Sequence, residues 1–144
     1  MHKHRKIVAV IVLVLVSAVV YFGGNFLTVQ FHQYRMKAAY RAAHKLGPAE
    51  PKRERLMASY ERHRSALMEL GYYTKTQFYF QRLCANSGEY REMQRRLPEQ
   101  FPYAIAKIEA HGYIFGEPPF IVVWLHPADQ KLVEQFVAAQ DAGR

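Results

Sequence analysis

The sequence predicts an α+β protein in which a single transmembrane helix leads into a helical stalk and then a small domain with a three-stranded sheet. Three observations predict this: an uncharged apolar run near the N-terminus, helical spacing of apolar residues up to Leu70, and alternating or wholly apolar segments after it. The 144 residues are enough for one modest domain. We expect a basic tail at 1–6, a transmembrane anchor at 7–29, a helical stalk or hairpin at 30–70 and an α+β domain at 71–144.

The first element is the apolar run 7–29, which contains no charged residue. At a rise of about 1.5 Å per residue this run gives roughly 35 Å of helix, against a hydrocarbon core of about 30 Å. A cleaved signal peptide ending near Ser17-Ala18 is the alternative. The chain stays apolar beyond that point, which favours an uncleaved signal anchor, and a buried helix of a soluble core is the remaining possibility.

Basic residues flank the apolar run on both sides, and no acidic residue occurs before Glu50. The seven basic residues are Lys3, Arg5 and Lys6 before the run and Arg35, Lys37, Arg41 and Lys45 after it. They account for all but one of the formal net charge of +8. A nucleic-acid-binding domain would carry this excess on its folded part, whereas these positions are typical of side chains that meet lipid headgroups. The lipid bilayer is therefore the expected partner, and nucleic acid is not.

The charge flanks also bear on orientation. A six-residue tail with its basic residues directly against the apolar run is typical of a signal anchor whose N-terminus stays in the cytoplasm. We therefore expect a single-pass cell-membrane protein with its domain on the extracytoplasmic side. In the alternative orientation the domain faces the cytosol, and the basic helix after the span binds anionic lipid or nucleic acid.

Two helices are expected between the anchor and the domain. The first covers 30–46 and ends at Gly47-Pro48; no helix breaker follows Gly24, so it continues the membrane helix as a stalk. The second covers 51–70, with Leu56, Tyr60, His63, Leu67 and Leu70 on one stripe, and Gly71 is placed to cap it.

After Gly71 the periodicity changes from helix to strand. Alternation predicts a strand at 72–83, with Phe78 and Phe80 on one face, and a second strand at 105–115, with Ala106 and Ile108 sharing a face. A short helix between them begins at Asn86 or Ser87 and is expected to end at Leu97, before Pro98.

The last strand and helix complete the domain. The run 120–125 is apolar on both faces, which is typical of a central strand, and Pro127 precedes a closing helix at 128–139. Pairing the central strand antiparallel with both others gives the order 1-3-2, with helices on one face of the sheet.

No catalytic, cofactor or metal site emerges from the residues. A pair of Cys84 with His111 or His126 can be drawn, but its spacing does not call for nucleophilic chemistry. Metal binding by His2 with His4, or by His32 with His44, is equally weakly supported. The acidic residues lie beside Lys or Arg on helix surfaces, and no phosphate-binding glycine motif is present.

Aromatic residues give the remaining functional signal. Tyr73, Tyr79, Tyr113 and Phe115 fall on strand faces opposite the expected core. Aromatic side chains dominate protein interfaces, so these residues are candidate contacts for a partner, unless the stalk helices cover them. We therefore expect a non-enzymatic binding module that engages an envelope protein or a second copy of itself, with a small membrane-anchored enzyme as the least favoured class.

Overall fold

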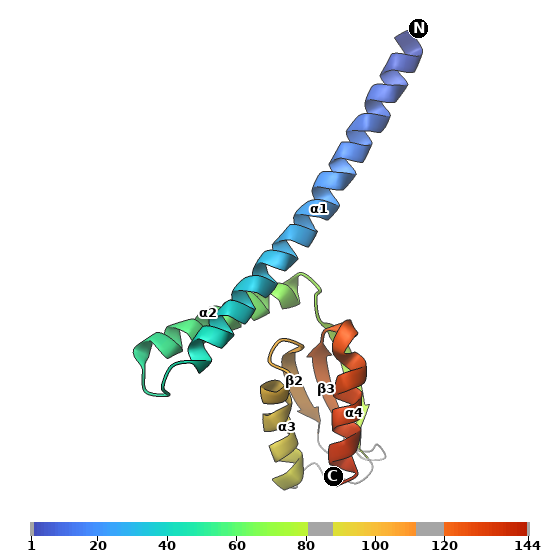
Figure 1. Ribbon diagram of the computed structural model, residues 1–144. Coiled ribbons are helices and arrows are strands. Elements are labelled where there is room, and N and C mark those ends of the chain that lie inside the picture. The colour runs from blue at the N-terminus through green and yellow to red at the C-terminus, as the bar shows by residue number, and fades with distance from the viewer. Residues whose placement is uncertain (1, 81–87, 112–119, 144) are drawn as a thin grey trace.

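The computed structural model describes residues 2–80, 88–111 and 120–143 (Figure 1). Its elements in chain order are α1 (His2–His44), α2 (Pro51–Glu69), β1 (Thr74–Tyr79), α3 (Gly88–Gln100), β2 (Ile105–His111), β3 (Phe120–Leu125), a 3-10 turn (Pro127–Asp129) and α4 (Gln130–Asp141). The predicted α+β architecture is confirmed: a long apolar N-terminal helix precedes a three-stranded antiparallel sheet.

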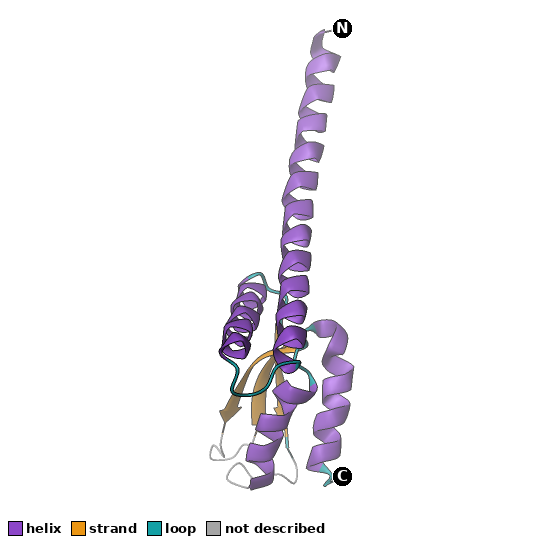
Figure 2. Cartoon of the chain, turned by 60° about the vertical axis from the view of Figure 1, so that its left-hand side comes forward, coloured by secondary structure: helices purple, strands orange, loops and turns teal. Residues whose placement is uncertain are grey.

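Helix α1 is one uninterrupted helix of 43 residues. The apolar run and the first stalk helix are therefore parts of the same element, as the lack of a breaker predicts. Gly23 and Gly24 do not interrupt it, and the Thr28 hydroxyl donates to the Gly24 carbonyl at 2.8 Å. Figure 2 shows the N-terminal part of α1 extending well beyond the rest of the molecule.

Helix α2 folds back along the C-terminal part of α1, and we call residues 29–69 the helical hairpin. The turn between the helices is closed by Glu50, whose carboxylate accepts from the Gly47 N–H at 2.9 Å. The end of α2 is capped as predicted, because Gly71 adopts a φ of 73° that favours glycine. The Tyr72 N–H donates to the Leu67 carbonyl at 3.0 Å, which completes a Schellman motif.

The sheet has the predicted order β1-β3-β2, and both pairs are antiparallel. The central strand β3 has the predicted bounds. Strands β1 and β2 are shorter in the described residues than the predicted 72–83 and 105–115. The predicted ends at 81–83 and 112–115 lie outside the described residues, as does the expected cap at Asn86 or Ser87.

One prediction about β2 is wrong. Strict alternation placed Ala106 and Ile108 on the same face, but the register shifts between Ile105 and Lys107. This irregularity lets Ile105 and Ile108 both enter the main core, while Ala106 packs against the hairpin. A bulge adds one residue to one strand and so reverses the alternation beyond it.

The main core lies between the sheet and the pair α3 and α4, which cover one face of it (Figure 1). Its fully buried members include Phe80, Met93, Leu97, Ile105, Ile121, Val123, Leu125 and Val133. Helix α3 extends to Gln100, so the prediction that Pro98 stops it is wrong. Pro98 lies in the last turn, where its missing N–H costs only one helical hydrogen bond and buried Leu97 holds the turn in place.

A second core joins the hairpin to the opposite face of the sheet, which we call the outer face. Met36 and Ala39 of α1 and Tyr60 and Leu67 of α2 pack against Tyr73 and Ala106, and Trp124 lies at its margin. The hairpin is thereby part of the folded domain and covers one end of the outer face. Because α1 belongs to this core, the apolar segment is fixed directly to the domain.

Candidate functional site

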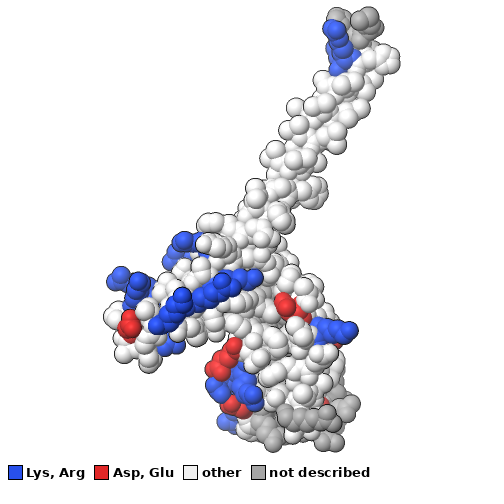
Figure 3. All heavy atoms as spheres, in the orientation of Figure 1, with Lys and Arg blue, Asp and Glu red and all other residues white. Residues whose placement is uncertain are grey.

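The exposed part of α1 is the most distinctive surface of the chain. Large apolar side chains from Ile7 to Leu27 are at least half exposed, Leu13 at 69% and Phe22 at 71% among them. Figure 3 shows this segment as a continuous uncharged cylinder with basic residues near its N-terminal tip. A soluble monomer rarely exposes a contiguous apolar patch larger than a few hundred Å². By length and composition this helix is able to cross a membrane.

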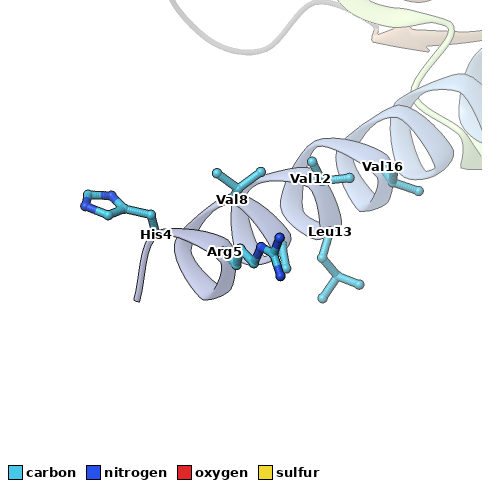
Figure 4. A pocket seen from close by; sticks show the side chains of 7 residues that line it. His4, Arg5, Val8, Val12, Leu13 and Val16 are labelled. Carbon is cyan, nitrogen blue, oxygen red and sulfur yellow. The ribbon is translucent and has the colours of Figure 1, made fainter. Parts of the chain in front are cut away.

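A hollow on this segment is not a binding pocket in the usual sense. Its lining residues, from His4 to Val16, all come from one helix (Figure 4). It is the open groove between neighbouring side chains of an isolated helix, without a second wall. In a bilayer, lipid chains would fill such a groove.

The seven basic residues predicted to flank the membrane are distributed unevenly. Arg5 and Lys6 are exposed beside the start of the apolar run, while the side chain of Lys3 lies outside the described residues. Beyond the run, Arg35, Arg41 and Lys45 are exposed, and Lys37 is half-buried over the Tyr103 ring at 5.7 Å. Since α1 is a single helix, Arg41 and Lys45 lie about 18 Å and 24 Å along its axis from Val29.

The aromatic residues predicted to face a partner have different fates. Tyr73 does lie on the side away from the main core, but it is buried under the hairpin with only 5% of its surface exposed. The expectation that it is exposed is therefore wrong, and coverage by the stalk helices is the reason. Tyr79 is 55% exposed and contacts the Phe120 ring. Tyr113 and Phe115 lie outside the described residues.

Trp124 marks the point where the hairpin stops covering the outer face. Lys75 from β1 and Lys107 from β2 place their ammonium groups 5.4 Å and 4.9 Å from the Trp124 ring. Lys107 also pairs with Glu109 at 2.5 Å. These cation–π contacts shield the tryptophan edge from water and separate the hairpin from the Tyr79 end of the face.

A histidine pair links the two helices of the hairpin where α1 leaves the domain. The Nδ1 atoms of His32 and His63 lie 2.8 Å apart, a hydrogen-bond distance, and the Phe31 ring packs edge-on against both imidazoles. Burial, followed by the positive charges of His32, Arg35 and Arg62, lowers the pKa of His63. The pair is therefore a strongly electropositive point on the hairpin.

Sequence reasoning missed this pair. It considered His32 with His44, but those residues lie twelve positions apart on one helix, and the His44 Nδ1 instead contacts the Tyr40 carbonyl at 2.9 Å. The signal that pointed to the pair was His63 itself, a polar residue on the apolar stripe of α2. A histidine in that position needs a polar neighbour on the facing helix.

The other candidate chemical groups do not come together in the described residues. Cys84 and the side chain of His111 lie outside them, and the His126 ring stacks on Tyr72 at 4.1 Å. No group of three or more His, Cys, Asp or Glu side chains suited to a metal occurs in the part of the chain that the structure describes. The carboxylates of Glu92 and Glu99 both bind Arg95 on the surface of α3.

These features define a class of protein: a chain with one helix long and apolar enough to cross a membrane, fixed rigidly to a small α+β domain. Comparison with protein-family models, with curated proteins and with solved structures gives no match for this chain.

Proposed function

We propose that the protein is a non-enzymatic binding module that α1 anchors in the cell membrane, with its domain on the extracytoplasmic side, where it engages a protein of the envelope. The observation that carries this proposal is that α1 belongs to two environments at once. Its residues 7–27 expose apolar side chains, and Met36 and Ala39 on the same helix are buried in the second core. A chain built this way holds its domain at a fixed position against the bilayer.

Charge supports the orientation. Arg5 and Lys6 adjoin the apolar run, and a short basic tail tends to remain in the cytoplasm. The segment 71–144 has eight basic and eight acidic residues, so it carries no net charge that would oppose export.

The alternative, a cytosolic domain whose basic helix lies on anionic lipid, receives less support from the fold. The basic residues Arg41 and Lys45 continue along the axis of α1, away from the end of the apolar run, rather than along a membrane surface. At about 18 Å and 24 Å they are beyond the Debye length of about 8 Å at physiological salt.

The Tyr79 end of β1 is the surface that we assign to a partner. Strand β1 is at an edge of the described sheet, and its pairing with β3 is regular over all six residues, whereas the other edge strand, β2, has an irregular register. A hollow of about 450 Å³ beside it is lined by Phe78 and Tyr79 of β1 and by Val137 and Ala138 of α4. A regular edge strand next to a groove suits an added strand from another protein.

Orientation is tested by cysteine labelling in the full chain. Cys84 is the sole cysteine, so a Cys84→Ala background carries either Ala58→Cys, exposed on α2, or His4→Cys, exposed at the other end of α1. We expect an impermeant maleimide to label Ala58→Cys in intact spheroplasts and His4→Cys only after lysis. The reverse pattern would overturn the proposed orientation, and loss of the chain from carbonate-washed membranes would overturn the anchor.

The partner surface is tested by placing a photo-crosslinking amino acid at Tyr79, with the same substitution at Tyr34, 72% exposed on α1, as the control. A discrete adduct with one envelope protein from position 79, and none from position 34, supports the proposal. A dimer adduct from position 79 would identify self-association instead. Equal adducts from both positions would exclude a defined surface at Tyr79.

A further inference from the structure

Four positively charged or protonatable side chains gather where α1 leaves the apolar segment. His32 and Arg35 lie on α1, and Arg62 and His63 lie on the facing part of α2. The two histidines touch through their Nδ1 atoms at 2.8 Å, and both arginines act electrostatically on His63. We call these four residues the His/Arg cluster.

The cluster lacks a counter-charge in the described residues. Every charge that acts on His63 is positive: His32 and Arg35 from α1 and Arg62 from α2. Within 2–80, 88–111 and 120–143, neither arginine forms an ion pair, whereas Arg64, one turn of α2 away, pairs with Glu61. Burying a histidine pair next to two cations is unfavourable unless an anion joins them.

The height of the cluster indicates where that anion comes from. His32 and Arg35 are three and six residues beyond Val29, the last residue of the uncharged run, which places them about 4.5 Å and 9 Å along the helix axis. The polar headgroup region on each side of a bilayer is about 5 to 8 Å thick. The cluster therefore lies at the level of the lipid phosphates when 7–29 fills the hydrocarbon core.

We propose that His32, Arg35, Arg62 and His63 form a binding site for the phosphate of an anionic phospholipid headgroup. Guanidinium groups bind phosphate oxygens through paired N–H donors, and an imidazole N–H adds a further donor. The Phe31 ring, 55% exposed and packed against His63, covers the apolar side of the site. This inference rests on the membrane anchor in the proposed function, and it assigns the bound lipid in addition.

Bound phosphate has a measurable consequence for His63. Its negative charge opposes the three positive charges that act on the imidazole, so the pKa of His63 rises when the site is filled. The test uses the full chain in nanodiscs, labelled with ¹³C-histidine, in zwitterionic phosphatidylcholine alone or with added phosphatidylglycerol. His63→Gln assigns the resonance. We expect His63 to titrate at higher pH in the anionic discs, and equal titration curves in both discs would overturn the site.

A matched pair of double variants separates a site from general charge attraction. Arg35→Gln with Arg62→Gln removes two cluster charges, and Arg41→Gln with Lys45→Gln removes two exposed charges farther along α1. Lipid retained after delipidation is counted by native mass spectrometry. The first variant should lose phosphatidylglycerol about fivefold per arginine, the factor that matches about 1 kcal/mol per basic residue at an anionic surface, and the second should match wild type. Equal losses in both variants would overturn the proposal.

Free phosphate is the remaining source of the same chemistry. Inorganic phosphate at millimolar concentration is added to the wild-type chain in phosphatidylcholine discs. An unchanged His63 titration supports a lipid site, because the lipid phosphate is concentrated in the plane of the cluster. A shift as large as that from phosphatidylglycerol would replace the lipid assignment by a soluble phosphate. Failure of the chain to remain in any disc would instead refute the anchor.

Discussion

Two tyrosine hydroxyls attach the helical hairpin to the sheet domain. The Tyr60 hydroxyl on α2 donates to the Pro102 carbonyl at 2.5 Å, and the Tyr73 hydroxyl donates to the Tyr103 carbonyl at 3.2 Å. Both side chains are buried, and burial raises the pKa of each phenol. Each ring thus contributes apolar area and one directed bond to the segment between α3 and β2.

Removing the Tyr60 hydroxyl should weaken this attachment. In Tyr60→Phe the Pro102 carbonyl loses its donor in a partly buried position, so we expect the free energy of unfolding to fall by about 1 kcal/mol. Urea titration of the full chain in detergent micelles, followed by circular dichroism, measures the change. The exposed Tyr34 supplies the control, since Tyr34→Phe should change stability by only a few tenths of a kcal/mol. Equal effects of the two substitutions would contradict the assigned bond.

Single residues also show where sequence reasoning stops. The outward face of Tyr73 was predictable from alternation, but its burial depends on the hairpin folding back over the sheet, a contact between residues 37 positions apart in the case of Met36 and Tyr73. The same holds for His32 and His63, since periodicity places each on its helix but does not align the two helices. Tyr79 was placed correctly because no helix reaches its end of the strand.

Among the elements, those with a strong local pattern were predictable. The bounds of β3 follow from its unbroken apolar run, and the end of α2 follows from Gly71. The reversal of faces in β2 was not predictable, because a bulge arises from how Ile105 fits the core and leaves no mark on the apolar pattern. Pro98 likewise stops a helix only if its turn is not held by packing, and Leu97 holds it.

The helical hairpin should respond to acid. The folded pKa of His63 is below its ordinary value of 6.5, so the unfolded hairpin binds a proton more readily than the folded one. Its stability is therefore complete above about pH 6.5 and declines as the pH falls through the folded pKa of His63. Hydrogen exchange of the α2 amides, measured in phosphatidylcholine discs at pH 7.5 and 5.5, should be faster at the lower pH after correction for intrinsic rates.

The control for this effect is the choice of histidine. His63→Gln should remove most of the pH dependence of exchange, because it removes the proton-binding group that the hairpin disfavours. His44→Gln changes an exposed histidine on the same hairpin and should leave the dependence unchanged. Identical pH profiles for wild type and His63→Gln would show that another group governs the acid response.

For the whole molecule, charge and hydrophobicity divide the chain into three regions. The tail carries three basic residues, the apolar run carries no charge, and segment 30–70 carries nine basic residues against four acidic ones. In Figure 3 the basic side chains accordingly gather on the hairpin and at the tip of α1. The membrane-spanning role of α1 depends on the middle region remaining free of charge.

Placing charge in the apolar run should release the chain from the membrane. Val16→Arg with Val19→Arg introduces two guanidinium groups near the middle of the run, each at a cost of about 2.5 to 3.5 kcal/mol for insertion at a helix centre. We expect the double variant to leave the carbonate-washed membrane pellet. His4→Arg adds a charge to the already basic tail and should remain in the pellet. Retention of the double variant would mean that the run does not lie in the hydrocarbon core.

The unbroken course of α1 also determines which neighbours the domain is able to meet. With no flexible linker between bilayer and domain, the Tyr79 surface stays at one altitude and cannot search the space above the membrane. A target resident in the same membrane must offer its matching segment at that altitude, while a target at a greater distance is out of reach. Each residue added to α1 beyond Val29 would raise the domain by about 1.5 Å and turn it by about 100°. Such a ruler-like dependence on helix length would distinguish this protein from one tethered by a floppy chain.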